Sequence, residues 1–127
     1  MAELIFYRVK NSLEWPNEDQ IWNAITGSLG MGSLPPGSYR LAREEMTPYD
    51  DQFVPEMLDG NGLGFYLPFY PEFERGHAFK DSAVGIHCGI SLPIDSGCIA
   101  LTANDASKFY YAMELKSAMP IMRLQVV

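Results

Sequence analysis

The chain is 127 residues long and carries 47% hydrophobic, 13% aromatic and 20% charged residues. Such a chain can bury one hydrophobic core but is too short for two, so we expect residues 1–127 to form a single domain. The aromatic content excludes a disordered chain. The formal net charge of -7 disfavours nucleic acid as a partner, because proteins that bind it neutralise phosphates with basic patches.

The first ten residues do not predict a secretory signal peptide. They contain an acidic residue, Glu3, and a short apolar run that ends before Arg8. No apolar run approaches the ~18 residues of a membrane helix, so membrane insertion is not expected. We therefore expect a chain that is synthesised in the cytoplasm without a signal peptide and that needs a delivery route to act elsewhere.

Short apolar runs separated by glycine and proline are typical of a mostly β domain. Residues 21–26 suit either a helical face or a strand, and their β-branched and aromatic content favours a strand. Residues 84–89 alternate, which places Cys88 on the apolar face of a strand and His87 on the other face. The other predicted strands are residues 4–9, 38–42, 65–69 and 121–127.

One helix is predicted, over residues 103–116. Thr102 followed by Asp105 forms an acidic variant of the capping box, and apolar residues recur at helical spacing from Ala106 to Met113.

The glycine-rich stretch 27–37 is interpreted as a loop, because it lacks the Gly-Lys-Ser/Thr ending of a phosphate-binding loop.

The residues best suited to catalysis precede this helix. His87 lies on a predicted strand, a turn follows, and then come Ser96, Gly97 and Cys98. A thiol needs a base or an electropositive setting to ionise near neutral pH, and an imidazole across a turn can supply it. Gly97 leaves the neighbouring amide N–H groups open to stabilise an oxyanion. The pattern predicts Cys98 as a nucleophile and His87 as its base, whereas Cys88 is expected to pack in the core.

This order resembles the catalytic segment of L,D-transpeptidases of the YkuD type, in which a histidine precedes a Ser-x-Gly-Cys segment. Here the segment is Ser-Gly-Cys, one residue shorter. The stretch LPPGSYRL at residues 34–41 resembles the strand entry of that family. The stretch FYLPFYP at residues 65–71, followed by the histidine strand, resembles a short branch that includes antibacterial effectors delivered by type VI secretion.

The resemblance implies a β-sandwich or barrel with one main helix after the cysteine. It implies a thiol enzyme that forms an acyl-enzyme with a peptidoglycan stem peptide. Water as the acceptor gives an L,D-carboxypeptidase, and an amine gives an L,D-transpeptidase or D-amino acid exchange. The implied catalytic residues are Cys98, His87, Ser96 and Gly97, and the implied substrate-binding residues are Gly85, Tyr39, Phe69, Arg75 and His77.

One departure concerns the substrate carboxylate. The family usually has arginine two residues after the nucleophile, where this chain has Ala100. The carboxylate must then be bound elsewhere, and the candidates are Arg40, Arg43, Arg75, Lys80 and Arg123. If the protein is such an effector, it is expected to act in the periplasm and to have an immunity protein as a partner.

Several alternatives remain open. A zinc site could use His77, His87, Cys88 and Cys98, but adjacent His87 and Cys88 should point to opposite faces of a strand, so neither a metal nor a cofactor is expected. A papain-like amidase would place its cysteine before its histidine. A non-catalytic binding module on the same fold and a phage-type lysin also fit. Whether Cys88 and Cys98 can form a disulfide is left open.

Overall fold

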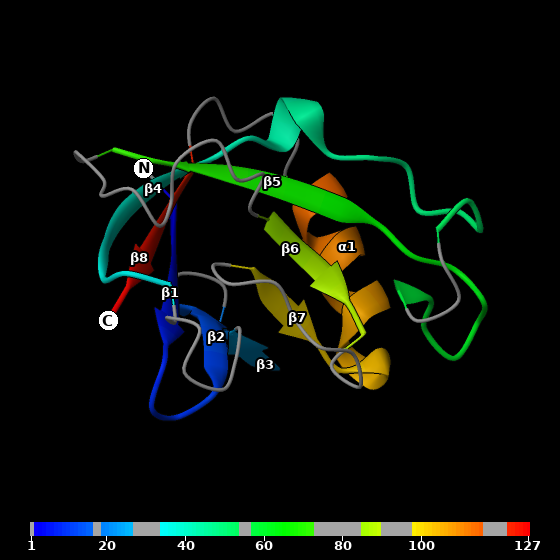
Figure 1. Cartoon of the computed structure of the whole chain (residues 1–127), viewed down its shortest axis with the longest axis horizontal. Coiled ribbons are helices and arrows are strands. Elements are labelled where there is room, and N and C mark those ends of the chain that lie inside the picture. The colour runs from blue at the N-terminus through cyan, green and yellow to red at the C-terminus, as the bar shows by residue number, and fades with distance from the viewer. Residues whose placement is uncertain are drawn as a thin grey trace.

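The computed structural model describes residues 2–16, 19–26, 34–53, 57–72, 85–89, 98–115 and 122–127. In these residues eight strands close into a barrel, and one α-helix packs against it (Figure 1). The strands are β1 (Ala2–Tyr7), β2 (Ser12–Trp15), β3 (Gln20–Thr26), β4 (Gly37–Leu41), β5 (Tyr66–Pro71), β6 (Gly85–Cys88), β7 (Ile99–Leu101) and β8 (Met122–Val126). The helix α1 (Ala103–Leu115) follows β7, and a short 3-10 helix, η2 (Arg43–Glu45), follows β4. The predicted fold class, mostly β with one main helix after the second cysteine, is confirmed.

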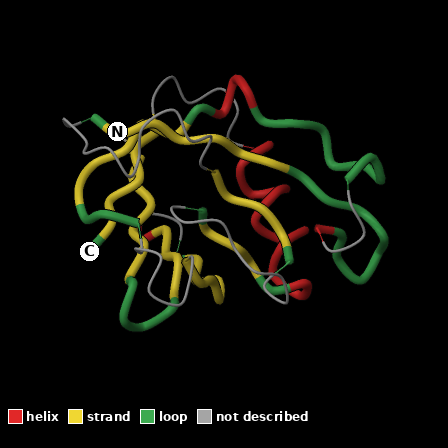
Figure 2. Tube along the Cα trace, viewed as in Figure 1, coloured by secondary structure: helices red, strands yellow, loops and turns green. Residues whose placement is uncertain are grey.

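The strands follow the order β1-β2-β3-β7-β6-β5-β4-β8, and β8 returns to β1. The β1–β8 and β6–β7 pairs are parallel, and the other pairs are antiparallel. Figure 2 shows α1 lying along one side of the strands. Within the described residues, no helix combines the length and the apolar composition that crossing a membrane requires.

Most of the predicted elements are confirmed within two residues at their ends. The ambiguous stretch 21–26 is strand β3, and the predicted helix 103–116 is α1. Two strands, β2 and β7, were not predicted from the sequence. β2 pairs with both β1 and β3, and its Leu13 and Trp15 are buried. Because β7 is only three residues long, its apolar run cannot be separated from the helix that follows.

Aromatic side chains from β3, from α1 and from the residue before β5 meet in the main core. Phe109 of α1 meets Trp22 edge to face, with ring centroids 5.1 Å apart, and stacks on Phe65 at 5.8 Å. Each of these three side chains is at most 2% exposed. Burying such a side chain stabilises the fold by roughly 1.5 to 3 kcal/mol. The helix therefore covers the inner face of the sheet formed by β3, β7, β6 and β5.

The first turn of α1 is fastened to β3 at Asn23. Thr102 N donates to Asn23 O at 3.3 Å, and Asn23 N donates to Asp105 Oδ2 at 2.8 Å. In a capping box the acidic side chain would instead accept the N–H of Thr102. The predicted capping box is therefore wrong: the Asp105 carboxylate accepts the N–H of Asn23 on β3 and not the N–H of Thr102. Because Thr102 directly follows β7, this link also fixes the position of β7.

Candidate active site

Strands β6 and β7 present different residues on their two faces. Ile86 and Cys88 of β6, with Ile99 and Leu101 of β7, belong to the main core beneath α1. Since side chains alternate along a strand, the residues between them face the other side of the sheet. The structure thereby confirms the prediction that His87 and Cys88 point to opposite faces.

The pairing of β6 with β7 brings the predicted nucleophile and base together. His87 pairs with Ala100 in the parallel register. Cys98 lies two residues before Ala100, and Gly85 lies two residues before His87, so Cys98 is level with Gly85 and shares its face. His87 and Cys98 are thus diagonal neighbours on adjacent strands, a relation that places Cα atoms about 7 to 8 Å apart, within reach of long side chains.

This outer face is also shielded from solvent. Cys98 is 5% exposed, His87 is 7% exposed and Ala100 is 0% exposed. Ile25 of β3, which pairs with Ala100, packs against Cys98 and Ala100 in an apolar cluster that is separate from the main core. A setting with little water strengthens any electrostatic interaction between a thiolate and an imidazolium.

The protonation of the His87 ring is fixed by a neighbouring backbone atom. His87 Nδ1 lies 2.7 Å from Cys88 O. A carbonyl oxygen can only accept a hydrogen bond, so Nδ1 must carry the proton. In the neutral ring Nε2 is then the basic nitrogen, the form that a general base requires.

Tyr66 is a site residue that the sequence reasoning missed. Tyr66 of β5 pairs directly with His87, and their rings lie nearly parallel, at 14°, with centroids 6.5 Å apart. A Cβ atom added to Gly85 would lie 2.6 Å from Tyr66 Cζ and 2.9 Å from its hydroxyl oxygen. The tyrosine ring therefore covers Gly85 and reaches toward the level of Cys98. Only the register of β5 against β6 reveals this, and no local sequence signal encodes it.

Gly85 was predicted to bind substrate. In the structure it lies against the Tyr66 ring and the backbone oxygen of Leu67. It is buried, and an added methyl group would also lie 2.7 Å from the backbone oxygen of Leu67. We expect Gly85→Ala to lower the free energy of unfolding by about 1 to 3 kcal/mol, because backbone and ring must both move. Urea unfolding measures this change. Gly60→Ala is the matched control, since an added Cβ there meets nothing within 4 Å, and equal behaviour of the two variants would contradict the packing described.

Two other predicted substrate contacts lie in the core. Tyr39 and Phe69 are both 0% exposed and meet edge to face at 5.3 Å, and the Tyr39 hydroxyl donates to Pro35 O at 2.7 Å. They occupy inward positions of β4 and β5, so their predicted contact with substrate is corrected to core packing. The predicted residues Ser96, Gly97, Arg75 and His77, and the candidate cation Lys80, lie outside the described residues.

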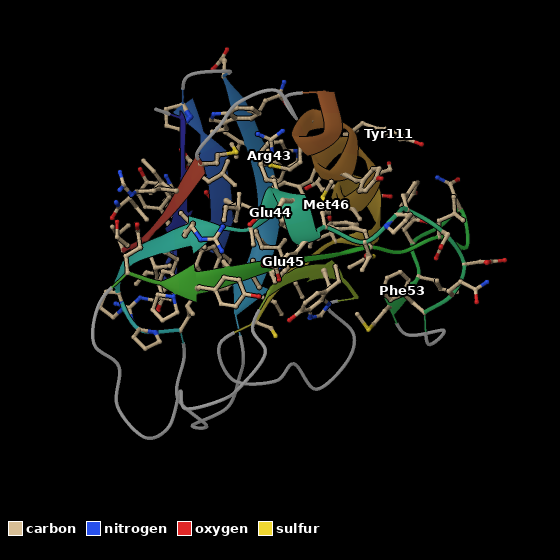
Figure 3. All side chains as sticks on the ribbon, turned by 90° about the horizontal axis from the view of Figure 1, so that it is seen from above. Arg43, Glu44, Glu45, Met46, Phe53 and Tyr111 are labelled. Atoms are coloured by element: carbon tan, nitrogen blue, oxygen red, sulfur yellow. The ribbon has the colours of Figure 1, made fainter. Side chains whose placement is uncertain are left out.

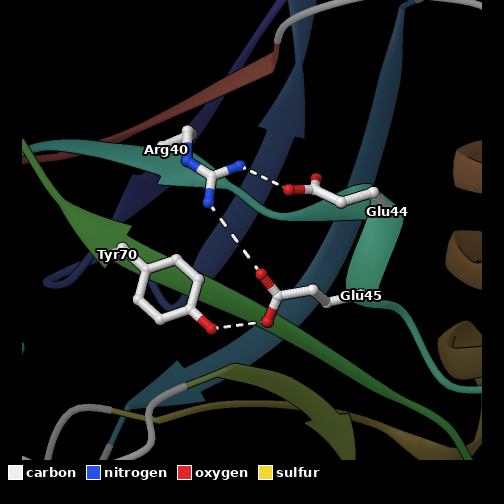
Figure 4. Close-up of polar contacts among 4 residues, drawn as sticks. All are labelled: Arg40, Glu44, Glu45 and Tyr70. Carbon is white, nitrogen blue, oxygen red and sulfur yellow. Dashed lines mark hydrogen bonds and ion pairs between the residues drawn. The ribbon is translucent and has the colours of Figure 1, made fainter.

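Two candidate arginines on β4 and β8 have acidic partners. Arg40 Nη1 lies 2.8 Å from Glu44 Oε2 and its Nη2 lies 4.0 Å from Glu45 Oε2, while the Tyr70 hydroxyl donates to Glu45 (Figure 4). Arg123 Nε lies 2.7 Å from Glu72 Oε1. In the register of the sheet both arginines lie on the same outer face as His87 and Cys98, but β5 separates their strands from β6.

Arg43 serves the helix. It extends from η2 toward α1, and its Nη2 donates to Met113 O at 2.6 Å (Figure 3). In the described part of the chain its Nε and Nη1 are buried without a hydrogen-bond partner, and burial lowers the pKa of the guanidinium. Arg43 is therefore placed at the last turns of α1, on the core side of the sheet.

Cys88 behaves as the predicted core residue. Its side chain is 0% exposed, and burial raises the pKa of its thiol to about 11. Because Cys88 and Cys98 face opposite sides of the sheet, a disulfide between them does not fit this fold. The same orientation keeps Cys88 from sharing a metal with His87 and Cys98.

Comparison with solved structures identifies the architecture. The chain aligns over 99% of its length with L,D-transpeptidase 1 of Mycobacterium tuberculosis, at 16% identity and a TM-score of 0.56. The fold is that of an L,D-transpeptidase-like domain. Bd1075 of Bdellovibrio bacteriovorus matches at 18% identity and a TM-score of 0.56, and the L,D-transpeptidase of Xylanimonas cellulosilytica at 16% and 0.50, each over 99% of this chain.

The similarity concerns the domain and not whole proteins. The chain covers 58%, 47% and 60% of these three structures, respectively. No protein-family model and no curated protein matches the sequence. At 16–18% identity, what the chain shares with these structures is the fold.

Proposed function

We propose that this chain is a cysteine-dependent peptidase or transpeptidase of peptidoglycan stem peptides, with Cys98 as nucleophile and His87 as base. The observation that carries the proposal is the pairing of β6 with β7, which sets both residues on one shielded face of an L,D-transpeptidase-like fold. The Nδ1 bond of His87 to Cys88 O supports the role of Nε2 as proton acceptor.

In the proposed reaction, His87 Nε2 takes the proton of the Cys98 thiol, and the sulfur attacks the carbonyl carbon of a bond to a D-residue. The tetrahedral intermediate collapses as the C–N bond breaks, and His87 returns the proton to the leaving amine. An acyl-enzyme remains. Water then releases the shortened stem, or the amine of a D-amino acid or a second stem replaces the enzyme. The Tyr66 hydroxyl, placed over Gly85, is close enough to this face to line the reacting centre.

The biological setting is a further part of the proposal. The resemblance of residues 65–71 and of the histidine strand to the short branch favours an antibacterial effector that is delivered to the periplasm and neutralised by an immunity protein. A phage-type lysin would use the same chemistry with another delivery route.

The test is incubation of the protein with tetrapeptide and pentapeptide muropeptides and a D-amino acid, followed by mass spectrometry. Loss of the terminal D-residue supports a carboxypeptidase, and its exchange supports a transpeptidase. Intact-protein spectra should show the added mass of the acyl group, and peptide mapping should place the adduct on the peptide that contains Cys98. Binding of muropeptides without turnover or adduct would instead favour a non-catalytic module, the alternative that replacement of the usual arginine by Ala100 suggests.

A further inference from the structure

The peptide bond between Cys88 and Gly89 is fixed on both of its sides. Gly89 N donates to Leu101 O of β7 at 3.2 Å, and Cys88 O lies 2.7 Å from His87 Nδ1. A trans peptide is planar, so its N–H and C=O groups point in opposite directions. With the N–H directed at β7, the carbonyl must point away from β7, toward the side where β5 places Tyr66 against the His87 ring.

Gly89 has a backbone conformation that this arrangement requires. Its φ angle is 109°, in the region that residues with a side chain rarely adopt. An L-residue at this position would be strained, or it would rotate the peptide unit and draw Cys88 O away from His87 Nδ1. Gly89 is buried, at the end of β6, and does not lie on the strand that carries the nucleophile.

We propose that Gly89 is a positioning residue for the base, and that β7 aligns both reacting groups. Cys98 directly precedes β7, and Leu101, the last residue of β7, accepts the N–H that orients the carbonyl next to His87. This inference rests on the proposed thiol chemistry of Cys98 and His87. It adds that the tautomer of His87 depends on the backbone conformation of Gly89, which follows β6 and lies outside β7.

The test compares alanine of each chirality at position 89. Gly89→Ala can be expressed directly, and Gly89→D-Ala can be assembled by ligating segments 1–87, 88–97 and 98–127, because Cys88 and Cys98 begin the second and third segments. A D-residue adopts positive φ without strain. Gly62→Ala is the matched control: Gly62 has a φ of 75° and open space for a Cβ, and it is exposed in the turn that follows Asp59.

Two readouts need no peptidoglycan. The 15N chemical shifts of histidine-labelled protein, which holds only two histidines, report the tautomer of His87. The pH dependence of iodoacetamide labelling at Cys98, mapped by mass spectrometry, reports the reactivity of the thiol. We expect Gly89→Ala to lose the Nδ1–H form and to slow labelling at pH 7 by about 10- to 100-fold. Gly89→D-Ala and Gly62→Ala should keep the wild-type tautomer and labelling profile.

Two results would overturn the inference. One is a folded Gly89→Ala protein that retains the Nδ1–H tautomer and the wild-type labelling profile. The other is a folded Gly89→D-Ala protein that has lost the Nδ1–H tautomer. This second result overturns the inference even if the Gly89→Ala protein does not fold. Failure of the proposed function gives a different result: wild-type Cys98 would react only on unfolding, while the tautomer of His87 would still follow the chirality at position 89.

Discussion

Cys98→Ala is expected to abolish turnover of muropeptides, with a loss of the order of 10³-fold or more relative to wild type. The sulfur of Cys98 is the atom that would form the acyl bond, and alanine leaves His87 without a group to deprotonate. The variant should still fold, because Cys98 belongs to a small apolar cluster with Ala100 and Ile25 and not to the main core. Circular dichroism and mass spectrometry of the products measure the two effects separately.

The other cysteine, Cys88, supplies the matched control. Cys88→Ala should retain activity while lowering the free energy of unfolding by about 1 to 2 kcal/mol, because it leaves a cavity in the main core. Iodoacetamide below pH 8 should label Cys98 and leave Cys88 unlabelled, since burial raises the pKa of the Cys88 thiol to about 11 and keeps it protonated there. Activity that survives Cys98→Ala, or that disappears with Cys88→Ala in a folded protein, would contradict the assignment of the nucleophile.

The local patterns in the sequence were sufficient for the parts of the site that depend on alternation. The strand around His87 could be predicted because the apolar residues Val84, Ile86 and Cys88 alternate with other residues. That pattern places His87 and Cys88 on opposite faces of the strand. The helix after Cys98 could be predicted because Ala106 and Phe109 recur at helical spacing. Both patterns are periodicities of side-chain direction, which follow from the local backbone conformation of a strand or a helix.

The parts that depend on strand pairing could not be predicted in this way. Tyr66 reaches His87 through the antiparallel register of β5 and β6, and Asp105 reaches Asn23 across 82 positions of sequence. Tyr39 and Phe69 illustrate the converse error. A family-like motif suggested that they contact substrate, whereas the pleat of β4 and β5 turns both side chains inward. Register and facing are set by the closed barrel as a whole.

The burial of Ala100 decides what the absent arginine means. Ala100 is 0% exposed and lies between His87 on β6 and Ile25 on β3 in the register of the sheet. A residue in that position does not face an open subsite. Replacement of arginine by alanine here is therefore compatible with catalysis, provided that the substrate carboxylate is bound by another part of the chain.

Ala100→Arg is accordingly expected to destabilise the protein and not to restore a carboxylate-binding residue. The packing neighbours Ile25 and Cys98 offer no carboxylate, and a buried charge without a partner costs roughly 3 to 5 kcal/mol in the free energy of unfolding. Ile21→Arg is the matched control. Ile21 lies on the same face of β3 as Ile25 but is 66% exposed, so the free energy of unfolding should change by no more than about 0.5 kcal/mol. Urea unfolding of both variants measures the difference. A stable Ala100→Arg protein that bound muropeptides more tightly than wild type would show that position 100 opens onto the substrate after all, and it would favour a binding module whose arginine has been lost.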